Sequence, residues 1–263
     1  MFSFTHEQKV VEISGVRLGG QPGQYPTVLF GGVFFKGEPD FQDMKRHLHT
    51  LVELSRNTGV PVIPDVFIRK ELWIEPIIEF IDKALPRHYP FSVDIIDPAI
   101  KIKTLEVLRE RKLLSRTIFN SIHIGSTKQE LETLSLCPPA AAIVVAFNPK
   151  DSSPDGRLEV LENGAHLTEQ GLIRLAEETG IPNLLIDTAA LAPEENSGAA
   201  IAAIPVVKEE YGLPTGCAIH NVVEKSLWLN EFPLAKKTVD VASNVTVPLF
   251  GGDFVIFGPI ENV

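Results

Sequence analysis

The sequence has few cysteines and no long uninterrupted hydrophobic run. Its 263 residues include only Cys137 and Cys217. Two such distant thiols exclude a disulfide framework and favour a reducing compartment, so we expect a cytoplasmic protein. No segment approaches the ~18 consecutive apolar residues of a membrane-spanning helix. The opening residues, MFSFTHEQKVVEI, lack the pattern of a signal peptide. The sequence therefore predicts no transmembrane segment.

Positive charge is also in short supply. The net charge is −10 and the sequence pI is about 5.2, so a nucleic-acid-binding face is not expected. With 44% apolar and 22% charged residues the composition is that of an ordinary globular protein. No low-complexity linker interrupts the chain, and residues 1–263 are expected to form a single domain.

Short runs of β-forming residues recur along the chain and are separated by stretches with apolar residues at helical spacing. Glu71–Leu85, Ile100–Leu114, Leu167–Thr179 and Ala200–Tyr211 are predicted helices, with Thr168 as a cap for the third. The predicted strands are Thr27–Phe35, Val62–Phe67, Phe91–Asp97, Thr117–Ile122, Ala141–Phe147, Leu184–Thr188, Cys217–Asn221 and Phe254–Phe257.

Eight strands alternating with helices favour an α/β fold of the (β/α)8 TIM-barrel type over an open, doubly wound sheet. No Gly-x-Gly-x-x-Gly follows the first of these strands, which weakens the dinucleotide-binding alternative. Ahead of the barrel, Val10–Ile13 and Val16–Leu18 flank the turn Ser14-Gly15 and predict a β-hairpin that caps the bottom. Asp151–His166 is expected to be a long irregular connection at the mouth.

Polar residues stand at or near the carboxyl ends of several strands. They are Asp94 in FSVDIID, Asn120 in TIFNSI, Asp187 in LLIDT and Asn221 in CAIHN, with Asn148 just beyond AAIVVAF. In a (β/α)8 barrel the carboxyl ends of the strands meet at the mouth, where active sites are built. A buried amide or carboxylate without a partner is costly. We therefore expect these side chains either to bind backbone groups or to face a ligand.

The chemistry of this set suits a flat, polar heterocycle. A carboxylate accepts two parallel N–H groups from the edge of a 2-amino-4-oxo-pyrimidine or pterin, and a carboxamide both donates and accepts. Each residue alone could instead cap the next helix, and Asp97 before Pro98 is expected to do so. Four polar intrusions at equivalent strand positions are harder to explain as independent caps.

A metal centre is not predicted. His47 and His49 lie two residues apart in an apparently helical segment and face different directions. His123, His220 and Asp65 could reach the mouth, but their spacing is not that of a metal-binding motif.

The sequence resembles a known family, the H subunit of tetrahydromethanopterin S-methyltransferase and its relatives, the methylcorrinoid:tetrahydrofolate methyltransferases. The resemblance covers nearly the whole chain, and its most specific stretches are GGQPGQYPT at 19–27 and FGPIEN at 257–262. Phe4, Val11–Gly15, Asn120–Ile122 and Leu185–Asp187 add weaker matches. Relatives continue beyond the Gly-Pro-Ile motif into a further helix, so an eighth barrel helix is expected to be absent here.

The resemblance implies a methyltransferase that moves a methyl group between a corrinoid carried by a partner protein and N5 of tetrahydrofolate or tetrahydromethanopterin. It implies that Asp94, Asn120 and Asp187 bind the pterin and that Asn221 acts catalytically near N5, while Asn148 remains a pocket candidate. It also implies a homodimer or a larger methyltransferase complex. A pterin-binding or docking subunit without turnover remains the alternative, and a dihydropteroate-synthase type, whose glycine-rich and Lys/Arg signatures are not apparent, is a third.

Overall fold

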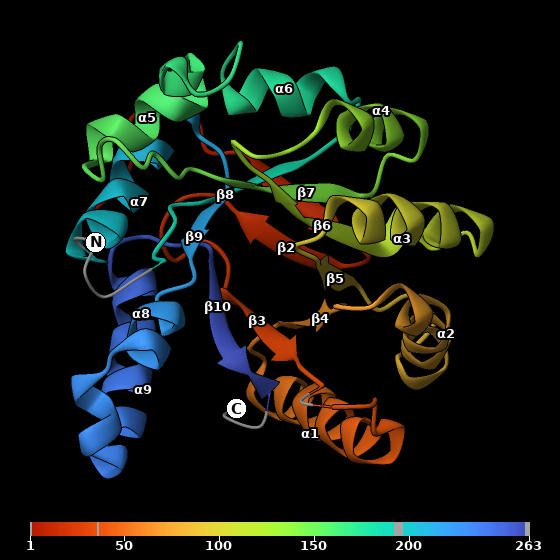
Figure 1. The fold of residues 1–263 in the computed structure, drawn as a ribbon. Helices are drawn as coiled ribbons and strands as arrows, with labels where there is room; N and C mark the ends of the chain where they lie inside the picture. Colours follow the sequence, from red (N-terminus) through yellow and green to blue (C-terminus); the bar gives the residue numbers. More distant parts are fainter. Residues whose placement is uncertain (1, 36, 192–196, 261–263) are drawn as a thin grey trace.

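A closed barrel of eight parallel strands forms the centre of the structure, a computed structural model that describes residues 2–35, 37–191 and 197–260 (Figure 1). The α/β-barrel prediction is confirmed. Around the barrel the strands follow their order in the sequence, and the last one closes on the first. They are β3 (Val28–Val33), β4 (Val62–Phe67), β5 (Phe91–Asp94), β6 (Thr117–Ile122), β7 (Ala141–Val145), β8 (Leu184–Asp187), β9 (Thr215–Cys217) and β10 (Phe254–Pro259).

Helices surround the barrel and bury its outer face. The outward side chains of the strands pack against apolar helix residues such as Leu51, Ile77 and Leu108. The α-helices are α1 (Phe41–Thr58), α2 (Ile74–Ala84), α3 (Pro98–Glu110), α4 (Lys128–Leu136), α5 (Pro154–Glu162), α6 (Leu172–Glu178), α7 (Ser197–Tyr211), α8 (His220–Lys225) and α9 (Pro233–Leu249). The short 3-10 segments are η1 (Glu71–Trp73), η2 (Leu114–Arg116), η3 (Gly164–His166) and η4 (Trp228–Glu231).

The predicted hairpin closes the bottom of the barrel. It consists of β1 (Val10–Ile13) and β2 (Val16–Gly19), paired antiparallel. Its buried residues Val11, Ile13 and Leu18 join one apolar cluster with the lower interior of the barrel. Because the bottom is plugged by packed side chains, a ligand can enter only from the opposite end.

Three segments differ from the sequence-based expectation. Asp151–His166 is not irregular, because Ser153 caps α5 by accepting from the Gly156 amide and Pro154 occupies the first turn. Thr168 does not cap the following helix, which begins after Gly171. The seventh strand is Thr215–Cys217, and the stretch expected to be its end turns into α8.

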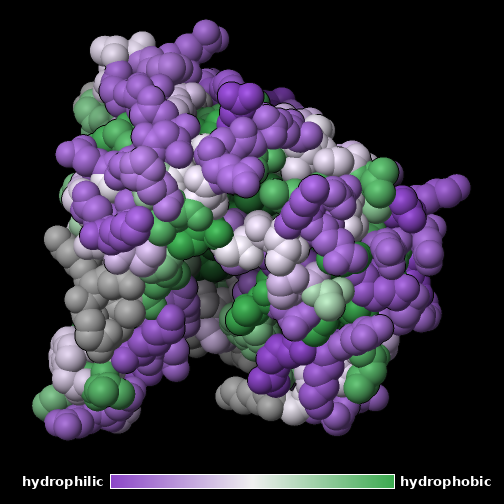
Figure 2. Space-filling view, turned by 45° about the horizontal axis from the view of Figure 1, so that its top comes forward, coloured by the Kyte–Doolittle hydropathy of each residue, from purple (hydrophilic) through white to green (hydrophobic). Residues whose placement is uncertain are grey.

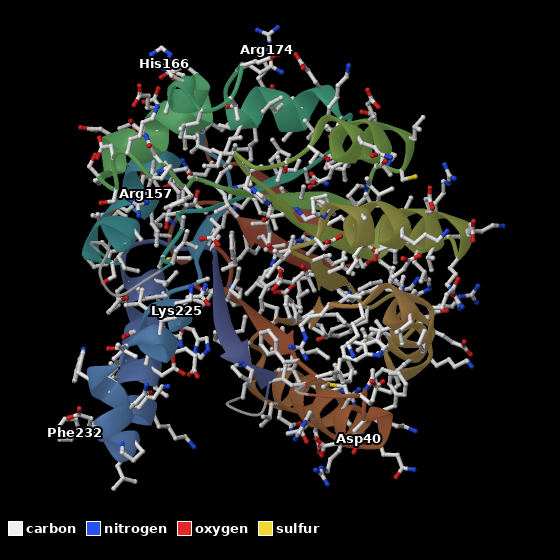
Figure 3. All side chains as sticks on the ribbon, viewed as in Figure 1. Asp40, Arg157, His166, Arg174, Lys225 and Phe232 are labelled. Atoms are coloured by element: carbon white, nitrogen blue, oxygen red, sulfur yellow. The ribbon has the colours of Figure 1, made fainter. Side chains whose placement is uncertain are left out.

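β10 ends at Pro259, and Ile260 alone follows it within the described ranges, so the expected absence of a further helix stays a prediction. The outer faces of β3 and β10 are left partly open between α1 and α9, in a groove of about 410 Å³ lined by residues such as Leu29, Val245 and Phe257. The molecule is hollowed between the α8–α9 arm and the rest of the barrel (Figure 2). Phe232 lies at the far end of that arm (Figure 3). No helix in the described ranges is long and apolar enough to cross a membrane.

Candidate functional site

The alternation of side chains along the strands turns the predicted polar residues into the barrel. Ile118 packs in the lower interior and Phe119 in an outer cluster, so Asn120 points inward again. Asp94 is paired with Asn120 in the register of β5 and β6 and faces the same side. Asp187 follows the interior residue Leu185 by two positions. Three of the sequence-predicted side chains are thus brought together at the mouth.

Asp65 completes this cluster. Asn120 donates from Nδ2 to Asp65 Oδ2 at 3.1 Å, a contact between β4 and β6 that crosses the barrel interior over β5. The other oxygen, Oδ1, is buried and has no hydrogen-bond partner among the described residues. Burial, together with the charge of Asp187, raises the pKa of Asp65 to about 6, although Ser92 and Asn120 oppose this. Ser92 is paired with Asp65 in the register of β4 and β5, so the nearest donors to this buried carboxylate are a neutral amide and a neutral hydroxyl, and among the described residues it forms no ion pair. A buried carboxylate without a cationic partner is costly.

Asp187 is more firmly held. Its Oδ1 accepts from the Ala189 amide at 2.8 Å, and burial raises its pKa to about 6 against the effects of the Ala189 and Ala218 backbone and of Arg157. The buried Arg157 guanidinium donates to Thr188 O at 2.5 Å and to Ala189 O at 3.2 Å. Arg157 belongs to α5, which lies outside the strand β8 that carries Asp187 (Figure 3). The residues behind Asp187 therefore fix its orientation.

Asp94 has a different environment. It is partly exposed at the mouth, and its carboxylate has no side-chain hydrogen bond within the described ranges. Removal from bulk water, and then the negative charge of Asp65, raise the pKa of Asp94 well above its usual value, while Lys101 lowers it. A ligand that donates N–H groups would favour the ionised form of both carboxyls.

Asn221 lies in the first turn of α8 rather than on a strand, which corrects the element predicted for it. Its backbone N–H donates to Ala218 O at 3.0 Å. Next to it, His220 Nδ1 lies 2.9 Å from Asp240 Oδ1 in α9, and its ring lies against Gly258, where a Cβ would come within 2.5 Å of ring atoms. This arrangement explains the glycine in the FGPIEN stretch. Glu261 and Asn262 of that stretch lie outside the described residues.

Asn148 is buried and its amide is used by the neighbouring loop. Its Nδ2 donates to Gly156 O at 3.0 Å, and its Oδ1 accepts from the amides of Lys150 and Asp151. These bonds hold the start of the β7–α5 connection in place. The structure does not bring Asn148 into hydrogen bonding with the Asp65–Asn120 pair.

Sequence reasoning undervalued Asp65 and missed the aromatic side of the mouth. The sequence places Asp65 in the predicted strand Val62–Phe67 and within reach of the mouth, but no local signal shows that it pairs with Asn120. Phe67 is paired with Asp94 in the register of β4 and β5, is partly exposed, and contacts Phe34 with ring centroids 5.7 Å apart. Within the described ranges, no three His, Cys, Asp or Glu side chains are arranged to hold a metal ion. The mouth thus combines carboxylates, an amide and an aromatic surface.

Comparison with known proteins relates the chain to one family over almost its whole length. Residues 6–263 match the family model described as the tetrahydromethanopterin S-methyltransferase MtrH subunit. The chain is 36% identical over 276 residues to the H subunit of tetrahydromethanopterin S-methyltransferase from Methanothermobacter thermautotrophicus, covering all of this chain and 88% of that protein. It is 35% identical over 275 residues to the H subunit of the putative methyltransferase mtx from Methanosarcina barkeri, covering 99% of this chain and 88% of the relative.

Solved structures of low sequence identity share the fold. A dihydropteroate synthase from Coxiella burnetii in complex with pteroic acid is 16% identical, with a TM-score of 0.65 and coverage of 94% of this chain and 92% of that one. The dihydropteroate synthase of Thermus thermophilus is 15% identical, with a TM-score of 0.64 and coverage of 97% and 95%. At such identities the likeness concerns the barrel alone. The family model and the curated relatives show that this chain belongs to the tetrahydromethanopterin S-methyltransferase MtrH subunit family.

Proposed function

We propose that this chain transfers a methyl group between N5 of a tetrahydropterin and a corrinoid carried by a partner protein. The observation that carries the proposal is the inward cluster at the mouth, in which the buried Asp65 carboxylate is met by the neutral Asn120 amide and Ser92 hydroxyl and, among the described residues, by no cation. A pterin presents N–H groups along one edge, and a carboxylate can accept two of them in parallel. The names of the relatives, which are methyltransferase subunits, support the same substrate class.

Within this proposal the cluster divides its tasks. Asp94 and Asp65 accept from the amino-pyrimidine edge, Asn120 holds Asp65 in place through its 3.1 Å bond and contacts the ring, and Asp187 binds the far edge of the pterin. Phe67 offers a flat apolar surface beside Asp94. Asn148, whose amide is occupied by the β7–α5 loop, acts on the site only by holding that loop in place.

Asn221 is the proposed catalytic residue. N5 must carry a proton when its methyl group leaves, because a neutral tertiary amine is a poor methyl donor. A carboxamide can accept from the protonated nitrogen and donate to the unprotonated one by rotating. Within the described ranges, no hydrogen bond of the Asn221 side chain competes with this role. The corrinoid supplies the cobalt centre that gives or takes the methyl group, and the protein contributes chiefly by positioning the pterin.

The proposal is tested with N5-methyl-tetrahydrofolate and free cob(I)alamin, with the cobalt absorption as readout. Calorimetry with tetrahydrofolate and tetrahydromethanopterin identifies the preferred pterin. Asn221→Ala should slow transfer more than it weakens pterin binding, whereas Asp94→Asn should weaken binding. Equal losses of transfer and binding in Asn221→Ala would remove its catalytic role.

The alternative is a pterin-binding subunit without turnover in a larger methyltransferase complex. The observation behind it is the cluster itself, whose hydrogen-bonding groups suit binding of a heterocycle whether or not methyl transfer follows. Sedimentation of the purified chain, alone and with a corrinoid protein, distinguishes a monomer from the expected homodimer and from a larger complex. Pterin binding without methyl transfer, even with a corrinoid protein present, would establish the alternative.

A further inference from the structure

A fully buried ion pair lies behind the barrel wall at the level of the cluster. Lys101 in α3 and Glu130 in α4 each have a side chain 1% exposed, and Lys101 Nζ lies 2.8 Å from Glu130 Oε1. Burying two charges carries a desolvation penalty that a surface ion pair does not. The penalty is offset only when further hydrogen bonds satisfy the remaining donors and acceptors of the pair. This pair therefore needs an explanation beyond simple packing.

The pair is hydrogen-bonded to the backbone of β6 next to Asn120. Lys101 Nζ donates to Ser121 O at 2.8 Å, and its ammonium lies 5.2 Å from the centroid of the Phe119 ring. Ser121 directly follows Asn120. Lys101 thus contacts β6 from outside the barrel at Ser121, while the adjacent Asn120 side chain faces the mouth.

Glu130 extends the network into the loop after β6. Its Oε1 also accepts from Ser126 Oγ at 3.3 Å, and it forms a capping box with Thr127 at the start of α4. The Ser126 hydroxyl in turn accepts from the His123 amide at 3.1 Å. Lys101 and Glu130 therefore fix both the end of β6 and the loop that follows it.

We propose that Lys101 is a positioning residue for the pterin site, which fixes the main chain beside Asn120 and provides a positive charge behind Asp94. The inference rests on the proposed function for the identity of the ligand. The charged groups that act on Asp94 are Asp65 from β4, which raises its pKa, and Lys101 from α3, which lowers it. Glu130 faces Lys101 directly, and both lie close enough to His123 to affect its pKa.

The test follows the Asp94 carboxyl by 13C NMR titration in the full chain, with Asp94→Asn for assignment. Lys101→Met should raise the Asp94 midpoint, because a nearby cation is removed, and should weaken binding of N5-methyl-tetrahydrofolate about tenfold at pH 7. Glu130→Gln leaves the cation without its counter-charge and should shift the midpoint downward. If Lys101→Met is poorly folded, Lys101→Met/Glu130→Leu replaces the pair by apolar groups; the two charge effects on Asp94 then oppose each other, and weaker pterin binding is the readout for the lost Ser121 bond.

Lys208→Met is the matched control. Lys208 is another buried lysine in an ion pair, 2.6 Å from Asp253, but it donates to Gly20 O in the loop after the hairpin. Its substitution should lower stability while leaving the Asp94 midpoint unchanged. The positioning role of Lys101 would be overturned if wild type, Lys101→Met and Glu130→Gln had equal Asp94 midpoints and bound the pterin equally well. That outcome would leave the proposed function standing. Absence of pterin binding in the wild type would overturn the proposed function and, with it, the positioning role.

Discussion

Asp65→Asn should stabilise the protein at neutral pH while weakening pterin binding. The Asp65 side chain is 3% exposed, and its pKa is raised from 3.8 to about 6, chiefly by burial. A carboxyl whose pKa is higher in the folded state binds an extra proton there between the two values. The free energy of unfolding therefore falls as pH rises from about 4 to 6 and stays low above that range.

The magnitude follows from the shift. About two pKa units correspond to about 3 kcal/mol of penalty at pH 7. An asparagine avoids this penalty and can still accept the bond from Asn120 Nδ2 through its carbonyl oxygen. Its amino group would need an acceptor in place of the unpaired Oδ1, which costs about 1–2 kcal/mol. The net gain is about 1–2 kcal/mol, or a rise in Tm of roughly 2–4 °C.

Urea unfolding at pH 4, 5, 6 and 8 measures the effect. The advantage of Asp65→Asn over wild type should be absent near pH 4, grow through pH 6 and remain constant above it. Asp97→Asn is the control, since Asp97 is an exposed cap of α3 and asparagine caps a helix equally well. An advantage that does not change with pH, or an Asp65→Asn protein less stable than wild type at pH 8, would refute the reasoning.

Three further substitutions test separate parts of the structure. Gly258→Ala should lower the free energy of unfolding by about 1–3 kcal/mol, because φ is +90° and a Cβ would lie 2.5 Å from the His220 ring. Thermal unfolding measures this loss, and a smaller loss would contradict the prediction. Lys208→Met should lose about 3–5 kcal/mol in urea unfolding because Asp253 remains buried without its cation; a neutral result would mean that water reaches Asp253. Asn148→Ala should cost about 1–3 kcal/mol through its lost loop bonds. Thermal unfolding that matches wild type would remove that assignment.

The barrel was predictable because its strands are short apolar runs separated by helices with clear periodicity. Two local errors have physical causes. Ser, Pro, Asp and Gly mark irregular loops, but Ser153 and Pro154 are equally good residues for starting a helix, and the buried Val160 and Leu161 give that helix a core face. In CAIHN the β-forming residues suggested a strand, whereas the Thr215–Cys217 strand ends earlier and Asn221 lies in the first turn of α8.

The positions of Asp94, Asn120 and Asp187 were also predictable, because strand ends in a barrel converge. Their partners were not. The bond from Asn120 to Asp65 joins residues 55 positions apart, and the support of Lys101 comes from a helix outside the barrel. Local sequence patterns predict which side of its own strand or helix a side chain faces. Contacts between elements depend on how those elements pack against one another.

The carboxyls at the two ends of the barrel differ in their partners, and this difference distinguishes a role in stability from the proposed role in ligand binding. Asp65 and Asp187 are buried, the Asp253 side chain is 8% exposed, and all three carboxyls have a pKa of about 6. Asp253, at the end of the barrel that the hairpin closes, has a lysine and a backbone amide as partners. Asp65, at the open end, has one amide and, within the described ranges, an unpaired oxygen. A carboxylate that served only the fold would gain from a cation such as Lys208. Asp65 has only the neutral Asn120 amide and Ser92 hydroxyl beside it, which leaves the N–H groups of the proposed ligand to balance its charge.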